Sequence, residues 1–124
     1  MILVDTSVWI DHLRSGDPRL ATLLEVGQVL AHPWVTGELA LGQMANRQEV
    51  LGLVDNLPQA LVATVPEVLT LIETHRLFGL GIGYVDAHLL ASTLVTAQAS
   101  LWTRDQRLNA AASRLGVASA GSRS

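Results

Sequence analysis

Short apolar runs alternate with helix-like periods along the whole chain, and this alternation is the feature that most constrains the fold. The runs have the length and branched residues of buried strands, and they are Ile2–Val4, Val29–Ala31, Leu61–Val65, Leu101–Thr103 and the least apolar, Val117–Ser119. Between them, apolar residues recur at the i, i+3, i+4 spacing of an amphipathic helix. The alternation predicts an α/β fold, with a parallel sheet of about five strands and helices on both faces.

Turn residues divide these elements. Gly16-Asp17-Pro18 and His32-Pro33 each predict the start of a helix, because proline suits a first helical turn. The glycines between 79 and 83 predict a turn into a helix over about 84–97, since their spacing is wrong for a dinucleotide-binding fingerprint and no clear strand precedes them. Length predicts a single domain over 1–124, with a frayed tail over about 120–124.

Composition excludes several kinds of site. The chain has no cysteine, and all eight of its basic residues are arginine. Without lysine the chain can have neither a phosphate-loop lysine nor a Schiff base. It also lacks the lysine that a receiver-like phospho-acceptor domain needs. The net charge of −3 argues against broad binding of duplex DNA, so any contact with nucleic acid is expected to be local.

The N-terminal sequence and the lengths of the apolar runs predict a soluble, cytoplasmic protein without a membrane span. The first charge falls at position 5 with no basic region before it, and no apolar run approaches the roughly 18 residues that cross a bilayer. The mean hydropathy is nevertheless positive, +0.35. That value predicts an apolar surface covered by a partner or by a second copy.

Acidic residues follow two of the predicted strands and begin or enter two of the predicted helices. Asp5 and Asp105 come directly after strands, where ligands bind in parallel sheets. Each could instead cap the helix that follows it. Asp86 falls in a first helical turn, which favours negative charge. Glu38 lies in the nearly uncharged stretch VTGELALGQM and is expected to be largely buried, where a lone carboxylate would need a partner.

These four acids would repel one another if the fold brought them together. Two carboxylates about 5 Å apart repel by roughly 3 kcal/mol at an effective dielectric near 20. A divalent cation removes that cost, and hard oxygen ligands favour Mg²⁺ or Mn²⁺. Zinc fits less well without cysteine or a paired histidine motif. We expect His12 and His75 to face solvent, His32 to begin a helix, and His88 to lie on a different helix face from Asp86.

Four stretches in this order, MILVDTSVWIDHLR, GELALG, GIGYVDAHLLA and LWTRDQRL, resemble a PIN-domain ribonuclease and, more narrowly, the VapC toxins of type II (VapBC) toxin–antitoxin pairs. The resemblance covers essentially the whole chain. It implies a PIN-like α/β/α sandwich and an Mg²⁺- or Mn²⁺-dependent endoribonuclease that cleaves tRNA or another structured RNA. An alternative within the same fold is a non-catalytic PIN-like module for dimerisation or antitoxin binding.

The resemblance also implies roles for individual residues. The catalytic and metal-binding acids are Asp5, Glu38, Asp86 and Asp105, with Asp5 and Asp86 the most direct ligands. Hydroxyls that orient these acids are expected from Thr6 or Ser7, and from Thr103. Some relatives carry a further acid where this chain has Asn109, so the resemblance does not decide between one metal and two.

Partners follow from the family as well. The resemblance implies a VapB-like antitoxin, an RNA substrate, and a homodimer or a heterotetramer or octamer with antitoxin, with DNA bound only through the antitoxin and no membrane contact. Arg104 and Arg107, beside Asp105, could hold RNA phosphates or could be ordinary solvated charges. Trp9, Trp34 and Trp102 are expected in the core or at an interface rather than as base-stacking platforms.

Overall fold

The computed structural model describes residues 1–120, so the predicted frayed tail lies, apart from Ala120, outside the described residues. Three strands and seven helices follow one another along the described chain. They are β1 (Ile2–Val4), α1 (Thr6–Ser15), α2 (Pro18–Glu25), β2 (Val29–Leu30), α3 (Pro33–Leu41), α4 (Arg47–Asp55), α5 (Val65–Thr74), α6 (Tyr84–Val95), β3 (Ser100–Trp102) and α7 (Gln106–Arg114).

The sheet is parallel, with strand order β2-β1-β3. Ile2 lies opposite Val29 on one side and Ser100 on the other. The prediction of a parallel α/β sheet is therefore confirmed, but the prediction of about five strands is wrong for the described residues. Of the two missing strands, Val117–Ser119 is reduced to an isolated parallel bridge between Leu101 and Ala118, and Leu61–Val65 forms no strand. The other isolated bridge joins Ala31 to Gln59, two residues before Leu61.

The predicted strand Leu61–Val65 fails because a helix start takes over its last residues. Thr64 and Glu67 form a capping box, in which the Thr64 hydroxyl accepts from the Glu67 N–H at 3.2 Å and the Glu67 carboxylate accepts from the Thr64 N–H at 2.8 Å. Of the apolar side chains before it, Ala63 is buried, but Leu61 is 60% exposed and Val62 50%. Leu61 and Val62 therefore form an exposed apolar surface and not a buried strand.

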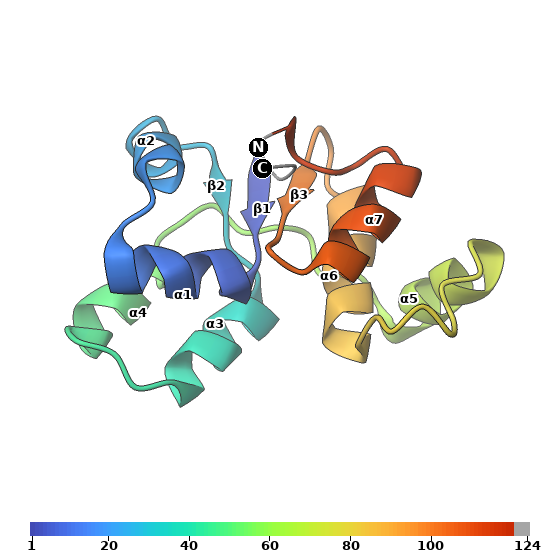
Figure 1. Cartoon of the computed structure of the whole chain (residues 1–124), viewed down its shortest axis with the longest axis horizontal. Coiled ribbons are helices and arrows are strands. Elements are labelled where there is room, and N and C mark those ends of the chain that lie inside the picture. Colours follow the sequence, from blue (N-terminus) through green and yellow to red (C-terminus); the bar gives the residue numbers. More distant parts are fainter. Residues whose placement is uncertain (121–124) are drawn as a thin grey trace.

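Helices cover both sides of the strands. Figure 1 shows α1 to α4 on one side of the sheet and α5 to α7 on the other, with the carboxyl ends of β1 and β3 opening between the two groups. Trp9 and Trp102 are almost fully buried, as predicted for core residues, whereas Trp34 is half-buried. No helix among residues 1–120 is long and apolar enough to cross a bilayer.

The glycine-rich segment before α6 forms the predicted turn. Gly79 and Gly81 adopt φ values of 74° and 77°, a region that L side chains rarely enter. The backbone at Gly81 also lies directly against the Arg107 side chain, so that even a methyl group there would collide with the guanidinium. This turn sets where α6 begins and therefore where its first-turn residues lie.

Candidate active site

Four carboxylates from four different elements gather at the carboxyl edge of the sheet. Asp5 follows β1, Asp105 follows β3, Glu38 lies on α3 and Asp86 lies in the first turn of α6. Burial and, after it, the negative charges of Asp5, Asp105 and Glu38 together raise the pKa of Asp86 from 3.8 to about 6. The structure thus places all four predicted acids within electrostatic reach of one another.

Asp5 is held by two hydroxyl groups. Its side chain is nearly buried, and its Oδ2 accepts hydrogen bonds from Ser7 Oγ and Thr103 Oγ1, each at 2.8 Å. Asp5 occupies the N-cap position of α1, yet its side chain makes no capping hydrogen bond. The capping explanation for this aspartate is wrong, because its carboxylate instead accepts from Ser7, in the first turn of α1, and from Thr103, directly after β3.

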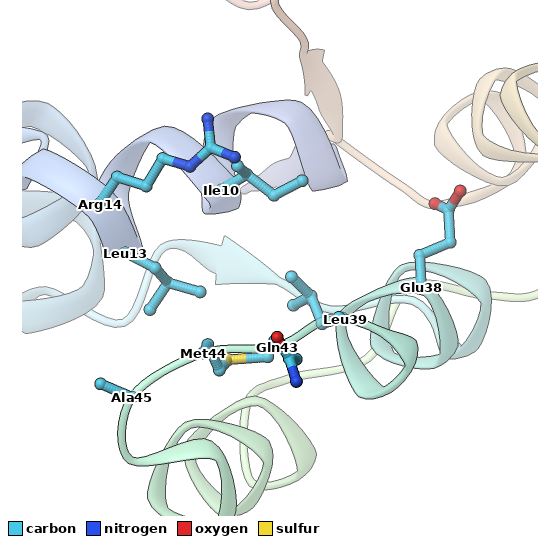
Figure 2. A pocket seen from close by; sticks show the side chains of 9 residues that line it. Ile10, Leu13, Arg14, Glu38, Leu39, Gln43, Met44 and Ala45 are labelled. Carbon is cyan, nitrogen blue, oxygen red and sulfur yellow. The ribbon is translucent and has the colours of Figure 1, made fainter.

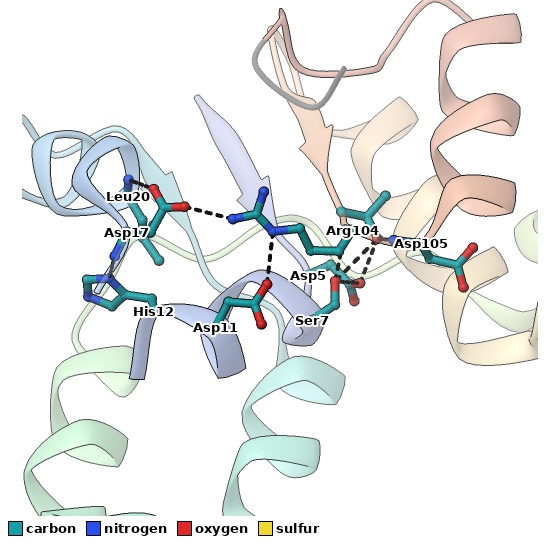
Figure 3. Close-up of polar contacts among 9 residues, drawn as sticks. Asp5, Ser7, Asp11, His12, Asp17, Leu20, Arg104 and Asp105 are labelled. Carbon is teal, nitrogen blue, oxygen red and sulfur yellow. Dashed lines mark hydrogen bonds and ion pairs between the residues drawn. The ribbon is translucent and has the colours of Figure 1, made fainter. Parts of the chain in front are cut away.

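The same two hydroxyls fix the turn between β3 and α7. Ser7 Oγ accepts from the Arg104 N–H and Thr103 Oγ1 accepts from the Asp105 N–H, both at 3.0 Å. Each hydroxyl therefore donates to Asp5 and accepts from the backbone of the β3–α7 turn. The positions of Asp5 and Asp105 are coupled through this small network, part of which is drawn in Figure 3.

Asp105 is an N-cap as well as a member of the acid group. Its Oδ1 accepts from the backbone N–H groups of Arg107 at 2.9 Å and Leu108 at 3.0 Å. The capping role considered from the sequence is confirmed here, and it is compatible with a second role because both bonds are made to one oxygen. The cap fixes the direction of an exposed carboxylate.

Glu38 is exposed, which corrects the prediction that it is largely buried. α3 turns Val35 and Leu39 into the core, so the glutamate between them projects outward in spite of its apolar neighbours. Thr6 donates its hydroxyl to Glu38 Oε1 at 2.7 Å, joining the start of α1 to the middle of α3. Thr6, Ser7 and Thr103 therefore contact the acids, in the positions where orienting hydroxyls are expected.

The two candidate arginines have different surroundings. Arg104 donates to Asp11 at 3.1 Å and to Asp17 at 2.7 Å, and Figure 3 shows its side chain directed away from Asp105 toward these partners. Arg107 lies at the exposed start of α7 against Gly81. Asn109 lies one turn after Asp105, where its N–H bonds to the Asp105 carbonyl.

Histidine does not join the acid group. His32 caps α3 as predicted, and burial followed by the charge of His88 lowers the pKa of His32 to about 4. His75 is exposed as expected, whereas His12 is half-buried and accepts from the Asp17 N–H. His88 is buried on another face of α6 from Asp86, as predicted.

The donor set suits a hard cation, although it is not drawn together as a ligand cage. Among residues 1–120, no group of three or more histidine or acidic side chains is close enough to hold a metal ion as it stands. The acids nevertheless supply carboxylate oxygens, and burial together with the charges of the other three acids raises the pKa of Asp86. Such a surplus of negative charge is what Mg²⁺ or Mn²⁺ would relieve.

An aromatic cluster adjoins the acids and was not predicted from the sequence as part of the site. The Trp34 ring stacks on His88 with centroids 4.0 Å apart, and Tyr84 meets both rings edge-on, at 6.2 Å from Trp34 and 4.6 Å from His88. The signal was the i, i+4 spacing of Trp34 with Glu38 and of Tyr84 with His88. That spacing puts Trp34 one helical turn from Glu38, and Tyr84 one helical turn from His88.

An apolar groove also begins at the acids. It has a volume of about 370 Å³ and runs between α1 and the segment joining α3 to α4, with Glu38 at one end (Figure 2). Its lining is mainly apolar with one basic side chain, and consists of Ile10, Leu13, Arg14, Glu38, Leu39, Gly42, Gln43, Met44 and Ala45.

Comparison with known proteins agrees with this fold and site. The family model of the PIN domain matches residues 2–113, and the chain therefore belongs to the PIN-domain family. It is 53% identical over 118 residues to Ribonuclease VapC32 of Mycobacterium tuberculosis (strain CDC 1551 / Oshkosh), covering 95% of both chains. The same values hold for Ribonuclease VapC32 of strain ATCC 25618 / H37Rv. The resemblance to VapC proteins of the PIN family is confirmed.

Proposed function

We propose that this chain is the toxin of a toxin–antitoxin pair and acts in the cytoplasm as a metal-dependent endoribonuclease on tRNA or another structured RNA. The observation that carries the proposal is the convergence of Asp5, Glu38, Asp86 and Asp105, where burial and the charges of the other three acids raise the pKa of Asp86 to about 6. The 53% identity to a ribonuclease over nearly the whole chain supports the same activity. A non-catalytic scaffold has no need to concentrate unfavourable charge in this way.

Asp5 and Asp86 would hold Mg²⁺ or Mn²⁺ most directly, with Glu38 and Asp105 completing the set. When bound, the cation supplies positive charge for the phosphate and lowers the pKa of a nearby water. Ser7 and Thr103 orient Asp5 through its Oδ2. One hard cation is the simpler assignment, because Asn109 brings no charge.

The remaining groups act on the water and the RNA. Glu38 or Asp105, both exposed, would accept the proton of the attacking water as a general base. Thr6 orients Glu38 by donating to one of its two oxygens. Arg107 is the arginine beside the acids that is available for an RNA phosphate, because Arg104 is engaged with Asp11 and Asp17.

The test is the Asp5→Asn variant, purified without antitoxin and assayed on total tRNA with Mg²⁺ and with EDTA. We expect the parent to cleave with Mg²⁺ and to stop with EDTA, and D5N to be inactive under both conditions. Asp55→Asn is the matched control, since Asp55 is an exposed acid at the end of α4, outside the acid group. Cleavage by D5N at the parent's rate, or cleavage that EDTA does not affect, would disprove the proposal.

The apolar groove beside Glu38 is our candidate for the antitoxin contact. Its lining offers apolar surface next to the acids, and Ile10 is 38% exposed there. A bound antitoxin segment would cover this surface and block the approach to Glu38. Ile10→Arg is expected to abolish co-purification with a co-expressed VapB-like antitoxin while cleavage is kept, whereas an unchanged complex would reject the groove.

We propose that a second copy of the chain covers the exposed aliphatic surface of α5 and α6. Leu69 on α5 and Leu94 on α6 are 51% and 39% exposed, in helices that pack on each other. The surface also includes Leu61, Val62, Val65 and Val95. We expect a homodimer in sedimentation experiments that Leu69→Glu converts to a monomer, and a monomeric parent would contradict this assignment.

A further inference from the structure

The acidic site adjoins a partly exposed aromatic surface, and we infer that Tyr84 and Trp34 form a stacking subsite for one unpaired nucleobase of the RNA, in contrast to the core or interface role expected for Trp34 from the sequence. The inference rests on the proposed ribonuclease function and adds to it the way in which the substrate is held. The chain has five aromatic residues besides histidine, and two of them meet here. Tyr84 is 47% exposed and Trp34 is half-buried, so both rings present surface to a ligand.

The geometry joins this surface to the acids through two helices. Trp34 lies one turn before Glu38 on α3, and Tyr84 lies two residues before Asp86 in the first turn of α6. The ring contacts of Trp34 with Tyr84 and His88 show that α3 and α6 approach each other at this level. A nucleotide bound at Glu38 would have the Trp34 ring one turn away along α3, with Tyr84 beside that ring.

The rings are supported from below. His88 is 2% exposed and lies stacked under Trp34 and edge-on to Tyr84. Neither of its ring nitrogens has a hydrogen-bond partner among residues 1–120. Its contribution is therefore packing, which fixes the orientation of the two outer rings and reduces the entropy lost when a base stacks on them.

The charge of the chain favours a contact with RNA that does not depend on phosphate. The protein has a net charge of −3, and RNA must approach four carboxylates. Arg104, one of the nearby cations, is already paired with two aspartates. Affinity from phosphate neutralisation is therefore small, and stacking, which is worth about 1–3 kcal/mol per base, is the contact that does not depend on charge.

A nucleobase fits this surface better than a protein side chain does. The aliphatic surface of α5 and α6 offers a protein partner branched apolar side chains. The Trp34–Tyr84 surface instead offers flat rings beside a site that acts on phosphodiesters, and unpaired RNA bases are commonly held by aromatic stacking.

The experiment measures binding in the D5N background, where RNA is not cleaved. The probes are a short single-stranded oligoadenylate and an abasic phosphodiester of the same length and charge. Because Trp9 and Trp102 are 1% and 2% exposed, quenching of tryptophan fluorescence reports on Trp34. We expect oligoadenylate to quench and to bind with a weak salt dependence, and the abasic chain to bind far more weakly.

Three variants test whether the aromatic ring of Tyr84 contributes to binding. Tyr84→Leu is expected to weaken oligoadenylate binding by about 5-fold to 150-fold, the range that corresponds to one base stack, and Tyr84→Phe to retain most of it. Phe78→Leu is the matched control, because Phe78 is 60% exposed and takes no part in the aromatic cluster. Each variant is first shown to melt with the parent's cooperativity.

Three results would overturn the inference. They are unchanged binding by Y84L, equal binding of the abasic chain, and a change of oligomeric state in Y84L at unchanged RNA affinity, which would assign the surface to a second copy. All three are independent of catalysis. They can occur while the parent still cleaves RNA and D5N does not, so failure of the subsite is distinguishable from failure of the proposed function.

Discussion

The hydroxyl of Thr103 donates to Asp5 Oδ2 at 2.8 Å, joining two residues that are 98 positions apart in the sequence. Asp5 ends the central strand and Thr103 follows the neighbouring one, so the bond spans the carboxyl edge of the sheet. The hydroxyl also accepts from the Asp105 N–H. The Thr103 side chain thus fixes the positions of Asp5 and Asp105 relative to each other.

Thr103→Val removes this bond while keeping the shape of the side chain. We expect Mn²⁺ affinity to fall by about 10-fold to 100-fold, the usual effect of losing a group that orients a metal ligand. Calorimetric titration of Mn²⁺ measures it. Thr22→Val is the matched control, because the Thr22 hydroxyl bonds only within α2 among the described contacts. Equal losses in both variants would mean that Thr103 does not orient Asp5.

Asp86→Asn is expected to stabilise the protein at neutral pH in the absence of divalent cations. The pKa of Asp86 is raised from 3.8 to about 6, so the folded chain binds this proton more tightly than the unfolded chain. The resulting stability is complete below about pH 4 and is lost as pH rises through 6. After a discount for solvent screening, D86N should gain about 1–2 kcal/mol in free energy of unfolding at pH 7.5 and almost nothing at pH 4.

Urea unfolding with EDTA at both pH values checks this prediction. Asp55→Asn, at an exposed site, should change the free energy of unfolding by less than about 0.5 kcal/mol. A D86N variant that is no more stable than the parent at pH 7.5 would show that Asp86 is not electrostatically disfavoured. Added Mg²⁺ should stabilise the parent more than D86N, since the cation relieves repulsion that the variant lacks.

Arg104→Gln is expected to lower kcat severalfold with little change in KM. Burial opposes ionisation of Asp17, but hydrogen bonds from the Leu20 N–H and from the Arg104 guanidinium hold the pKa of Asp17 below its usual range. The arginine therefore ties the β3–α7 turn to the turn before α2 and does not face the substrate. Steady-state cleavage compares it with Arg107→Gln, which should raise KM instead. A raised KM in R104Q would assign Arg104 to RNA binding.

Gly81→Ala is expected to destabilise the protein by about 1–3 kcal/mol. The φ of 77° strains an L side chain, and the new methyl group would displace the Arg107 guanidinium. Gly52→Ala is the matched control in the interior of α4, where a methyl group meets nothing within 4 Å. It should stabilise by up to about 1 kcal/mol. Thermal melts that rank the two variants in the opposite order would contradict the assigned backbone geometry.

The alternating pattern was enough to predict the central strand and the acids at strand ends. Ile2–Val4 is apolar at every position because β1 is paired on both sides, and the aspartate that ends it must then lie at the sheet edge. The role of Thr103 as an orienting hydroxyl came from the family resemblance, which did not identify Asp5 as its partner. Local spacing cannot supply that pairing, because the bond depends on which strands become neighbours.

The errors have local physical causes. Leu61 and Val62 were assigned to a strand on hydrophobicity, although Thr64 and Glu67 already had capping-box spacing. Glu38 was expected to be buried because its neighbours are apolar, but a helix can bury Val35 and Leu39 and still expose the residue between them. Tyr84 was overlooked because its partner Trp34 lies on a helix 50 positions away along the chain.

The narrowness of the sheet has a consequence for how this protein can associate. β2 contains two residues, and beyond β2 and β3 the sheet continues only as one isolated bridge on each side. Within the described chain, neither border of the sheet therefore has a long run of unpaired backbone N–H and C=O groups. Such borders offer a poor template for strand addition by another polypeptide. Aggregation by edge pairing is thereby discouraged, which favours association through side chains on helices and turns.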